Sequence, residues 1–253
     1  MRFKDKAALI TAVGSGIGHA TAEIMAKEGA LIIGVDNDQR RLDRTVEELN
    51  MTGGRAVGHC IDALNQAEVD DVVERTAKDY GIDILVNAVG GSTIIARPNA
   101  TIDELSLDDW QRVIQFNLQG TFLFTHAVVP VMKRQKSGKI VNLASIAGRG
   151  LSASSSSAYC AAKGGIIALT RKLSFELGPF GVNVNAIAPS LTLTERIRPH
   201  WNQRSPEAQS AEIERTPLRR VAEAADQAKV ICFLASSDAD FVTGLTIDVT
   251  GGL

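Results

Sequence analysis

Short apolar runs alternate with longer segments of helical periodicity along most of the chain. The apolar, β-branched runs predict strands at residues 7–11, 31–36, 56–62, 84–87, 139–144, 182–188 and 245–249. Apolar residues at helical spacing predict helices at residues 17–29, 42–49, 67–80, 107–136, 158–178 and 222–236, with a bend near Pro130 in the long fourth helix. Because such alternation builds right-handed crossovers, it predicts an α/β fold: one doubly wound sheet of about seven parallel strands with helices on both faces. We expect residues 1–253 to form a single domain.

Residues 190–220 break this pattern. They contain three prolines and several arginines but no clear strand. A segment of this length without regular structure is usually a functional lid or a disordered insertion. We therefore expect a substrate lid at residues 190–220 that becomes more ordered when ligands bind.

Composition and charge narrow the classes of function. Hydrophobic residues make up 45% and charged residues 22% of the chain, as in soluble globular domains. The 27 basic and 29 acidic residues give a net charge of -2, without the basic surplus typical of nucleic-acid binding or of an anionic membrane surface as partner. The cysteines and histidines are scattered, so neither a disulfide framework nor a metal site is expected. Since no signal peptide and no apolar run of ~18 residues is recognisable, the expected location is the cytoplasm, with no membrane partner.

A glycine-rich turn follows the first expected strand and leads into a helix, with the sequence TAVGSGIG at residues 11–18. Glycines let a backbone turn tightly and approach a pyrophosphate, and the helix N-terminus offers N–H donors to it. The spacing G-x-G-x-x-G is not met because His19 stands at the third position, so a turn that serves only chain geometry remains an alternative. Asp36 ends the second strand near the ~20-residue offset of the acid that holds an adenosine ribose, which favours a dinucleotide site.

Tyr159 and Lys163 lie one turn apart at the start of the helix expected at residues 158–178. Residues at i and i+4 share a helix face, with Cβ atoms ~5–6 Å apart. An adjacent ammonium favours the phenolate and is expected to lower the tyrosine pKa from ~10. Such a tyrosine can exchange a proton with an alcohol or an alkoxide, although chance surface pairs have the same spacing.

Over essentially its full length the sequence resembles the short-chain dehydrogenase/reductase family. The matches to the family's motifs are, in chain order, Thr11, Gly16 and Gly18 in the T-G-x-x-x-G-x-G turn, Asp62 after the third strand, Asn87 and Gly90 in the N-N-A-G segment, the catalytic Asn117 and Ser145, the Y-x-x-x-K pair Tyr159 and Lys163, and Pro189 and Thr194 in the P-G-x-x-x-T segment. The departures are Ala12, Ala88, Val89, Ser190 and Thr250. Ala12 is tolerable in place of the first glycine if its φ is negative. A serine run at residues 154–157 offers other candidates for the catalytic serine, but the strand-end position favours Ser145.

The resemblance implies a Rossmann-type fold and reversible hydride transfer between a nicotinamide and an alcohol or ketone carbon. It implies Tyr159 as general acid/base, Lys163 as the residue that binds the nicotinamide ribose and lowers the tyrosine pKa, Ser145 as the partner of the substrate oxygen, and Asn117 as the holder of a water. The cofactor-binding residues that we expect are Thr11, Gly14, Ser15, Gly16, Ile17, Gly18, Asp36, Asp62, Asn87, Gly90, Tyr159, Lys163, Pro189, Thr192 and Thr194. Relatives usually form tetramers through the helix that carries the Tyr–Lys pair and the helix before it, so a homotetramer is implied.

Three interpretations of function stay open. The leading one is an NAD-dependent oxidoreductase that interconverts a small secondary alcohol and a ketone. The second is a 3-oxoacyl-thioester reductase of the acyl-carrier-protein type, which would normally use NADPH; Asp36, with the non-basic Ser15 and Asn37 beside it, argues against that cofactor. The third is a nicotinamide-binding sensor or scaffold without turnover, which the intact Tyr159 and Lys163 disfavour.

The sequence indicates little about the identity of the substrate. The expected pocket walls are residues 91–93, 147–157 and the lid at 190–220, whose mixture of Ser, Thr, Leu and Ile favours a modest polar alcohol or ketone over a steroid. Arg196, Arg198 and Arg204 in the lid either face an anionic substrate or are solvated, and solvated lid arginines are the more common case.

Overall fold

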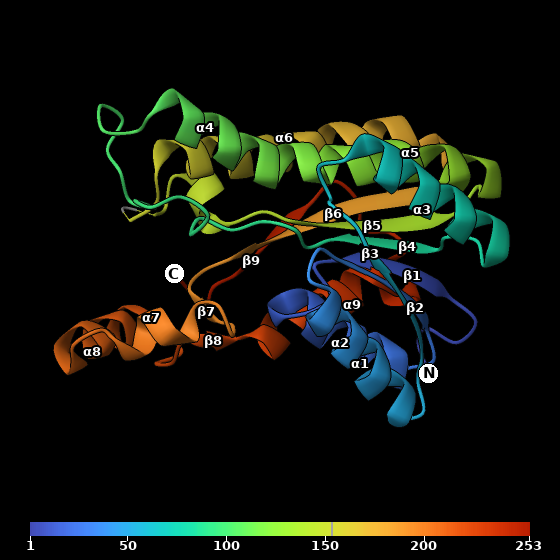
Figure 1. Cartoon of the computed structure of the whole chain (residues 1–253), viewed down its shortest axis with the longest axis horizontal. Coiled ribbons are helices and arrows are strands. Elements are labelled where there is room, and N and C mark those ends of the chain that lie inside the picture. The colour runs from blue at the N-terminus through green and yellow to red at the C-terminus, as the bar shows by residue number, and fades with distance from the viewer. Residues whose placement is uncertain (153) are drawn as a thin grey trace.

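The computed structural model describes residues 1–152 and 154–253. In this part of the chain one parallel sheet has the strand order β3-β2-β1-β4-β5-β6-β9 (Figure 1). Its strands are β1 (Ala7–Thr11), β2 (Leu31–Asp36), β3 (Arg55–Cys60), β4 (Ile84–Asn87), β5 (Gly138–Leu143), β6 (Val182–Pro189) and β9 (Thr246–Val249). The predicted doubly wound α/β fold is therefore confirmed. The order reverses between β1 and β4, and in open α/β sheets ligands bind beyond the carboxyl ends of the strands at such a reversal.

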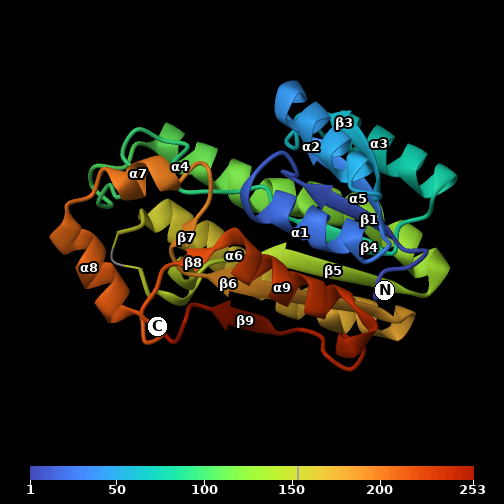
Figure 2. The same cartoon turned by 90° about the horizontal axis from the view of Figure 1, so that it is seen from below.

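Helices cover both faces of the sheet (Figures 1 and 2). One layer contains α1 (Gly16–Lys27), α2 (Gln39–Met51) and α9 (Ala224–Ala235); the other contains α3 (Gln66–Asp79), α4 (Leu107–Ile114), α5 (Gly120–Gln135) and α6 (Ser157–Leu177). Successive residues of a strand point to opposite faces. Ile10 accordingly packs with Met25 of α1 in one core, and its neighbour Leu9 packs with Phe124 of α5 in the other. The two cores fix the strands whose ends carry the site.

The helix expected at residues 107–136 is instead divided. A π-helical turn at Gln115–Gln119 separates α4 from α5, and α5 continues through Pro130. Asn117 lies inside this turn and is fully buried. Because π turns frequently mark functional sites, the irregularity that matters lies at Asn117 rather than at the proline.

The segment at residues 190–220 is more regular than its sequence predicted. It holds β7 (Thr192–Leu193), α7 (Arg198–Asn202) and α8 (Pro206–Arg215), and β7 pairs in parallel with β8 (Ala222–Glu223). Ser205 caps α8 by accepting a hydrogen bond from the backbone N of Ala208 at 3.3 Å, with Pro206 at the first helical position. The periodicity was hidden because both helices are short. They lie together at one end of the molecule, beyond the end of β6 (Figures 1 and 2).

Within the described residues, no helix is both long enough and apolar enough to cross a membrane.

Candidate active site

The turn between β1 and α1 brings the backbone close to any ligand at the end of β1. Gly16 has φ +60°, in the region that favours glycine. A Cβ on Gly18 would collide with the carbonyl oxygen of Ala12, so glycine there permits the close approach of helix and strand. Ala12 itself has φ +51°, not the negative φ that would make alanine neutral at this position. The turn therefore holds an alanine in the left-handed region, at a cost in strain.

Asp36 lies against this turn. Its Oδ2 accepts a hydrogen bond from the backbone N of Gly14 at 2.9 Å, and its Oδ1 accepts one from the backbone N of Asp38 at 3.0 Å. The carboxylate is buried and fixed at the end of β2. Arg41, in the first turn of α2, packs at the same place and pairs through Nε with Asp38 at 3.2 Å. Asp36 is thus fixed directly against the turn, with the side chain of Arg41 close by.

A lid carboxylate lies at the N-terminus of α1. The backbone N of Gly16 donates to Oε2 of Glu195 at 2.7 Å, and a Cβ on Gly16 would contact Thr194. A helix N-terminus favours an anion, so the carboxylate satisfies a donor that a phosphate would otherwise use. A pocket of about 280 Å³ extends from here between α1 and the lid. Sequence reasoning missed Glu195, although it directly follows the motif residue Thr194.

The loop after β4 is anchored by Thr11. Its Oγ1 accepts hydrogen bonds from the backbone N of Ala88 and of Val89, at 2.9 and 3.1 Å. Asn87 is buried in the sheet, where its Nδ2 donates to Asn142 Oδ1 at 2.8 Å. Asn87 Oδ1 is buried and has no hydrogen-bond partner within the described residues, so it is free to accept a hydrogen bond. Thr11 and Asn87 therefore position this loop whether or not they contact a ligand.

Asn117 holds the end of the same loop. Its Oδ1 accepts from the backbone N of Gly91 at 2.9 Å, and its Nδ2 donates to the carbonyl oxygen of Gly91 at 3.1 Å. A Cβ on Gly90 would meet both Asn117 Oδ1 and Lys163 Nζ, at 2.8 and 2.9 Å. Glycine at this position therefore leaves room for Asn117 and Lys163 to approach one another.

Tyr159 and Lys163 share one face of α6 as predicted. The Lys163 Nζ lies 5.7 Å from the centroid of the Tyr159 ring and donates to the carbonyl oxygen of Leu143 at 2.7 Å. Ser145 follows β5, its Oγ accepts from the backbone N of Ala147 at 3.1 Å, and it lies close enough to the Tyr159 side chain to affect the pKa of that phenol. A Cβ on Gly148 would collide with the backbone of α6, so this glycine permits the 3₁₀ turn Ile146–Arg149 to approach α6 closely. The structure thus brings Ser145, Tyr159 and Lys163 together.

The electrostatics differ from the sequence-based expectation. Burial raises the pKa of Tyr159, and hydrogen bonding with Ser145 and the charge of Arg196 act in the opposite direction. Burial, reinforced by the charge of Arg196, lowers the pKa of Lys163 from 10.5 to about 7. The expectation that Lys163 lowers the tyrosine pKa is therefore not met here, because burial disfavours the charged ammonium form of Lys163. The cation that acts on Tyr159 is Arg196.

Two of the other serines before Tyr159 serve the chain itself, whereas Ser157 Oγ is buried and has no hydrogen-bond partner among the described residues. Ser156 caps α6 by accepting from the backbone N of Tyr159 at 3.4 Å, and the Ser155 hydroxyl hydrogen-bonds to Ser152 at 2.8 Å. Residue 153, within the expected pocket wall at 147–157, lies outside the described residues.

The remaining predicted cofactor residues line the ends of the strands. Asp62 is exposed after β3, where its Oδ1 accepts from the backbone N of Leu64 at 2.9 Å. Pro189 ends β6, and Thr192 begins β7 with its hydroxyl 3.2 Å from Gln227 Nε2. The last two sit at the start of α1: Ser15 occupies the N-cap position without a capping side-chain bond, and Ile17 packs against the core.

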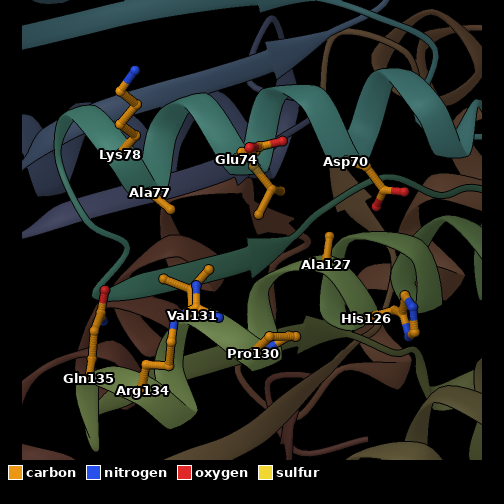
Figure 3. Close-up of a pocket in the computed structure, with 11 residues that line it drawn as sticks. Asp70, Glu74, Ala77, Lys78, His126, Ala127, Pro130, Val131, Arg134 and Gln135 are labelled. Carbon is orange, nitrogen blue, oxygen red and sulfur yellow. The ribbon is translucent and has the colours of Figure 1, made fainter.

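A second pocket lies away from these residues. It has a volume of about 850 Å³ and runs between α3 and α5, lined by Glu74 and Lys78 on one side and by His126 and Arg134 on the other (Figure 3). None of the predicted site residues lines it. We therefore assign the chemistry to the strand ends and not to this larger pocket. Among the described residues, no cluster of His, Cys, Asp and Glu could hold a metal ion.

Comparison with known proteins decides the family. A family model described as "Enoyl-(Acyl carrier protein) reductase" matches residues 11–253. The chain is 39% identical over 253 residues to the (2S)-[(R)-hydroxy(phenyl)methyl]succinyl-CoA dehydrogenase subunit of Thauera aromatica, covering 100% of this chain and 98% of the relative. The chain belongs to the short-chain dehydrogenase/reductase family. A 3-oxoacyl-[acyl-carrier-protein] reductase of Thermotoga maritima is 36% identical over 255 residues, covering 100% of this chain and 99% of the relative.

Solved structures of the family agree with this assignment. The crystal structure of a 3-oxoacyl-[acyl-carrier protein] reductase from Brucella melitensis with bound NAD matches with a TM-score of 0.89 and 34% identity, covering 100% of this chain and 94% of that chain. Short-chain dehydrogenases/reductases bind a nicotinamide cofactor and act on CH–OH groups. The residues of this chain fit such a cofactor. At the N-terminus of α1 the backbone N of Gly16 already holds an anionic group, the Glu195 carboxylate, and Asn87 at the end of β4 has a buried side-chain oxygen without a partner among the described residues.

Proposed function

We propose that this enzyme interconverts a small secondary alcohol and a ketone with NAD, using Tyr159 as general acid/base. The observation that carries the proposal is the juxtaposition of Ser145, Tyr159 and Lys163 where β5 ends and α6 begins. A family member whose function is only to bind a nicotinamide has no need of this arrangement, so the sensor interpretation is the weaker one.

Each residue of the group has a role in proton transfer. When bound, the nicotinamide takes up or gives back the hydride of the carbinol carbon. The Tyr159 oxygen takes the hydroxyl proton during oxidation and returns it during reduction. Ser145 donates to the substrate oxygen and stabilises its developing charge. Lys163 holds the nicotinamide ribose, and Asn117, through Gly91, keeps the loop after β4 in place and is the expected holder of a water.

The second candidate is a 3-oxoacyl-thioester reductase. The similarity to the 3-oxoacyl-[acyl-carrier-protein] reductase of Thermotoga maritima favours it, and the same residues would carry the proton. The two candidates differ in the substrate and in the cofactor. The test is a panel of secondary alcohols, ketones and one 3-oxoacyl thioester, with NAD and NADP, followed by nicotinamide absorbance.

The matched variant for this panel is Tyr159→Phe, which keeps the aromatic ring and removes the phenolic hydroxyl that exchanges the proton. Turnover should fall about 10²–10⁴-fold, while cofactor affinity stays within a few-fold. A variant that keeps more than a tenth of the wild-type rate would remove Tyr159 from its role. Cofactor binding without turnover of any panel member by the wild type would favour the sensor interpretation.

Cofactor choice depends on Asp36. A 2′-phosphate beside this buried carboxylate would repel it; two unit charges ~4 Å apart at an effective dielectric of ~20 interact by about 4 kcal/mol, and solvent reduces this. We expect kcat/KM to favour NAD over NADP roughly ten- to a hundredfold. Arg41 is the opposing charge, but Asp38 already pairs with it.

The variant Asp36→Ala should narrow this gap mainly by weakening NAD, whereas the exposed Asp43→Ala on α2 should leave it unchanged. Equal efficiency of the two cofactors in the wild type would mean that Asp36 does not contact the ribose.

We further propose a homotetramer in the cytoplasm, as the family resemblance implies. The cysteines Cys60, Cys160 and Cys232 are free thiols, which suits a reducing compartment. Light scattering on the purified enzyme tests the tetramer: a monomeric mass at micromolar concentration would overturn it.

A further inference from the structure

The lid arginines have different surroundings. The Nη2 of Arg198 lies 2.6 Å from Glu223 Oε2, and Arg204 lies 4.0 Å from Glu212 and over the ring of Trp201. Among the described residues, no carboxylate lies within ion-pair distance of Arg196. Its Nη2 donates to the carbonyl oxygen of Gly90 at 3.0 Å, although a guanidinium has five N–H donors.

Arg196 lies at the reacting end of the site. Its guanidinium packs flat against Gly91, in the space that a Cβ would fill, and Asn117 fixes Gly91 from another side. Its charge acts on both Tyr159 and Lys163. The pyrophosphate end of the cleft lies at Gly16. The backbone N of Gly16 donates to Glu195, the residue that precedes Arg196 in the chain.

A guanidinium in this position, with no ion-pair partner among the described residues, has N–H donors left to bind an anion. The Arg196 side chain is exposed, so a carboxylate from solvent can reach its guanidinium. A planar carboxylate satisfies such a group with two parallel hydrogen bonds, and a lysine could not make the same fork.

We propose that Arg196 is a specificity-determining residue that binds a carboxylate of the substrate, so that the enzyme acts on hydroxy acids or oxo acids. This inference rests on the proposed function and names its substrate class. The cofactor pyrophosphate is the other anion of the site, and its place is the N-terminus of α1, where Glu195, next to Arg196 in the chain, accepts from Gly16.

The first test compares 2- and 3-hydroxy acids with their methyl esters in the wild type and in Arg196→Gln. The wild type should prefer the acid over its ester in kcat/KM by roughly ten- to a hundredfold, and the variant should lose that preference mainly through KM. Arg198→Gln, which removes a paired arginine from the same lid, should keep it. Arg196→Lys should retain part of it, because the charge remains but the fork is lost. A wild type that prefers the esters, or treats both alike, overturns the proposal.

The second test is binding. Calorimetry with succinate as a non-reacting dicarboxylate, in the presence of NAD, should show an affinity that falls at least tenfold in Arg196→Gln and not in Arg198→Gln. Titration of NADH fluorescence should give the same Kd in all three proteins. Weaker NADH binding with unchanged succinate binding would assign Arg196 to the cofactor and refute the proposal. If the wild type turns over no panel member, the proposed function fails, and succinate binding still decides the role of Arg196.

Discussion

At the scale of single residues, Ala12 shows where the chain departs from its family at a measurable cost. Its φ of +51° is one that alanine adopts at a cost of roughly 1–2 kcal/mol. We predict that Ala12→Gly stabilises the protein by about 1 kcal/mol in urea denaturation, because the strain removed exceeds the entropy that glycine adds to the unfolded chain. The control Ala67→Gly, at an exposed position in the first turn of α3, should be destabilised by less than about 1 kcal/mol. Destabilisation by Ala12→Gly would show that the turn is not strained.

Lys163 gives a pH dependence of stability. Its pKa of about 7 lies below that of an unfolded lysine, so the folded state resists binding a proton that the unfolded state takes up readily. The resulting destabilisation is full below pH 7 and fades as the pH rises towards 10. We predict that Lys163→Met is more stable than the wild type at pH 6 by on the order of 1–3 kcal/mol, with a gain that shrinks by pH 10.

Thermal unfolding across this range, with the exposed Lys172→Met as control, measures the effect. A gain of the same size at pH 6 and pH 10 would mean that Lys163 is not desolvated. The sequence shows the spacing of Tyr159 and Lys163 but not this reversal of electrostatic roles, because burial depends on the packing of β5 and of the loop at Gly90 around the lysine.

At the scale of elements, the lid contributes a competitor for the cofactor site. The Glu195 carboxylate accepts from the backbone N of Gly16, which a pyrophosphate would also use. We predict that Glu195→Gln binds NAD about three- to thirtyfold more tightly, because a negative charge beside the phosphate is removed. The matched lid variant Glu207→Gln, at an exposed carboxylate in α8, should bind NAD as the wild type does. Fluorescence titration with NADH provides the comparison, and unchanged or weaker binding by Glu195→Gln would show that the carboxylate does not compete.

The regular elements were predictable wherever burial was continuous. All residues of β1 are buried on both faces, and their apolar run identifies the strand directly. The π turn around Asn117 was not predictable, since two of the three hydrogen bonds of its side chain are made with Gly91, far away in the sequence. The short helices α7 and α8 escaped prediction because neither offers enough turns to establish a period.

At the scale of the whole molecule, the reversal of strand order between β1 and β4 brings the residues of the site together. The glycine turn, the loop at Gly90 and the 3₁₀ turn after Ser145 all follow the carboxyl ends of adjacent strands. Motif spacing in the sequence predicted which residues would meet there. It did not predict Glu195, and it named Arg196 only as one of three lid arginines, because the lid returns to the cleft through contacts made only in the folded chain.

The central claim is that this gathering of residues catalyses transfer of hydrogen from a carbinol carbon to NAD, with Tyr159 taking the proton. The most direct measurement uses the best alcohol of the panel with deuterium at the carbinol carbon, and follows the isotope by NMR of the reduced cofactor. We predict one deuterium on the nicotinamide ring for each ketone formed, at a rate reduced about 10²–10⁴-fold in Tyr159→Phe. Ketone formed without deuterium in the nicotinamide, or an equal rate in the Tyr159→Phe variant, would contradict the account.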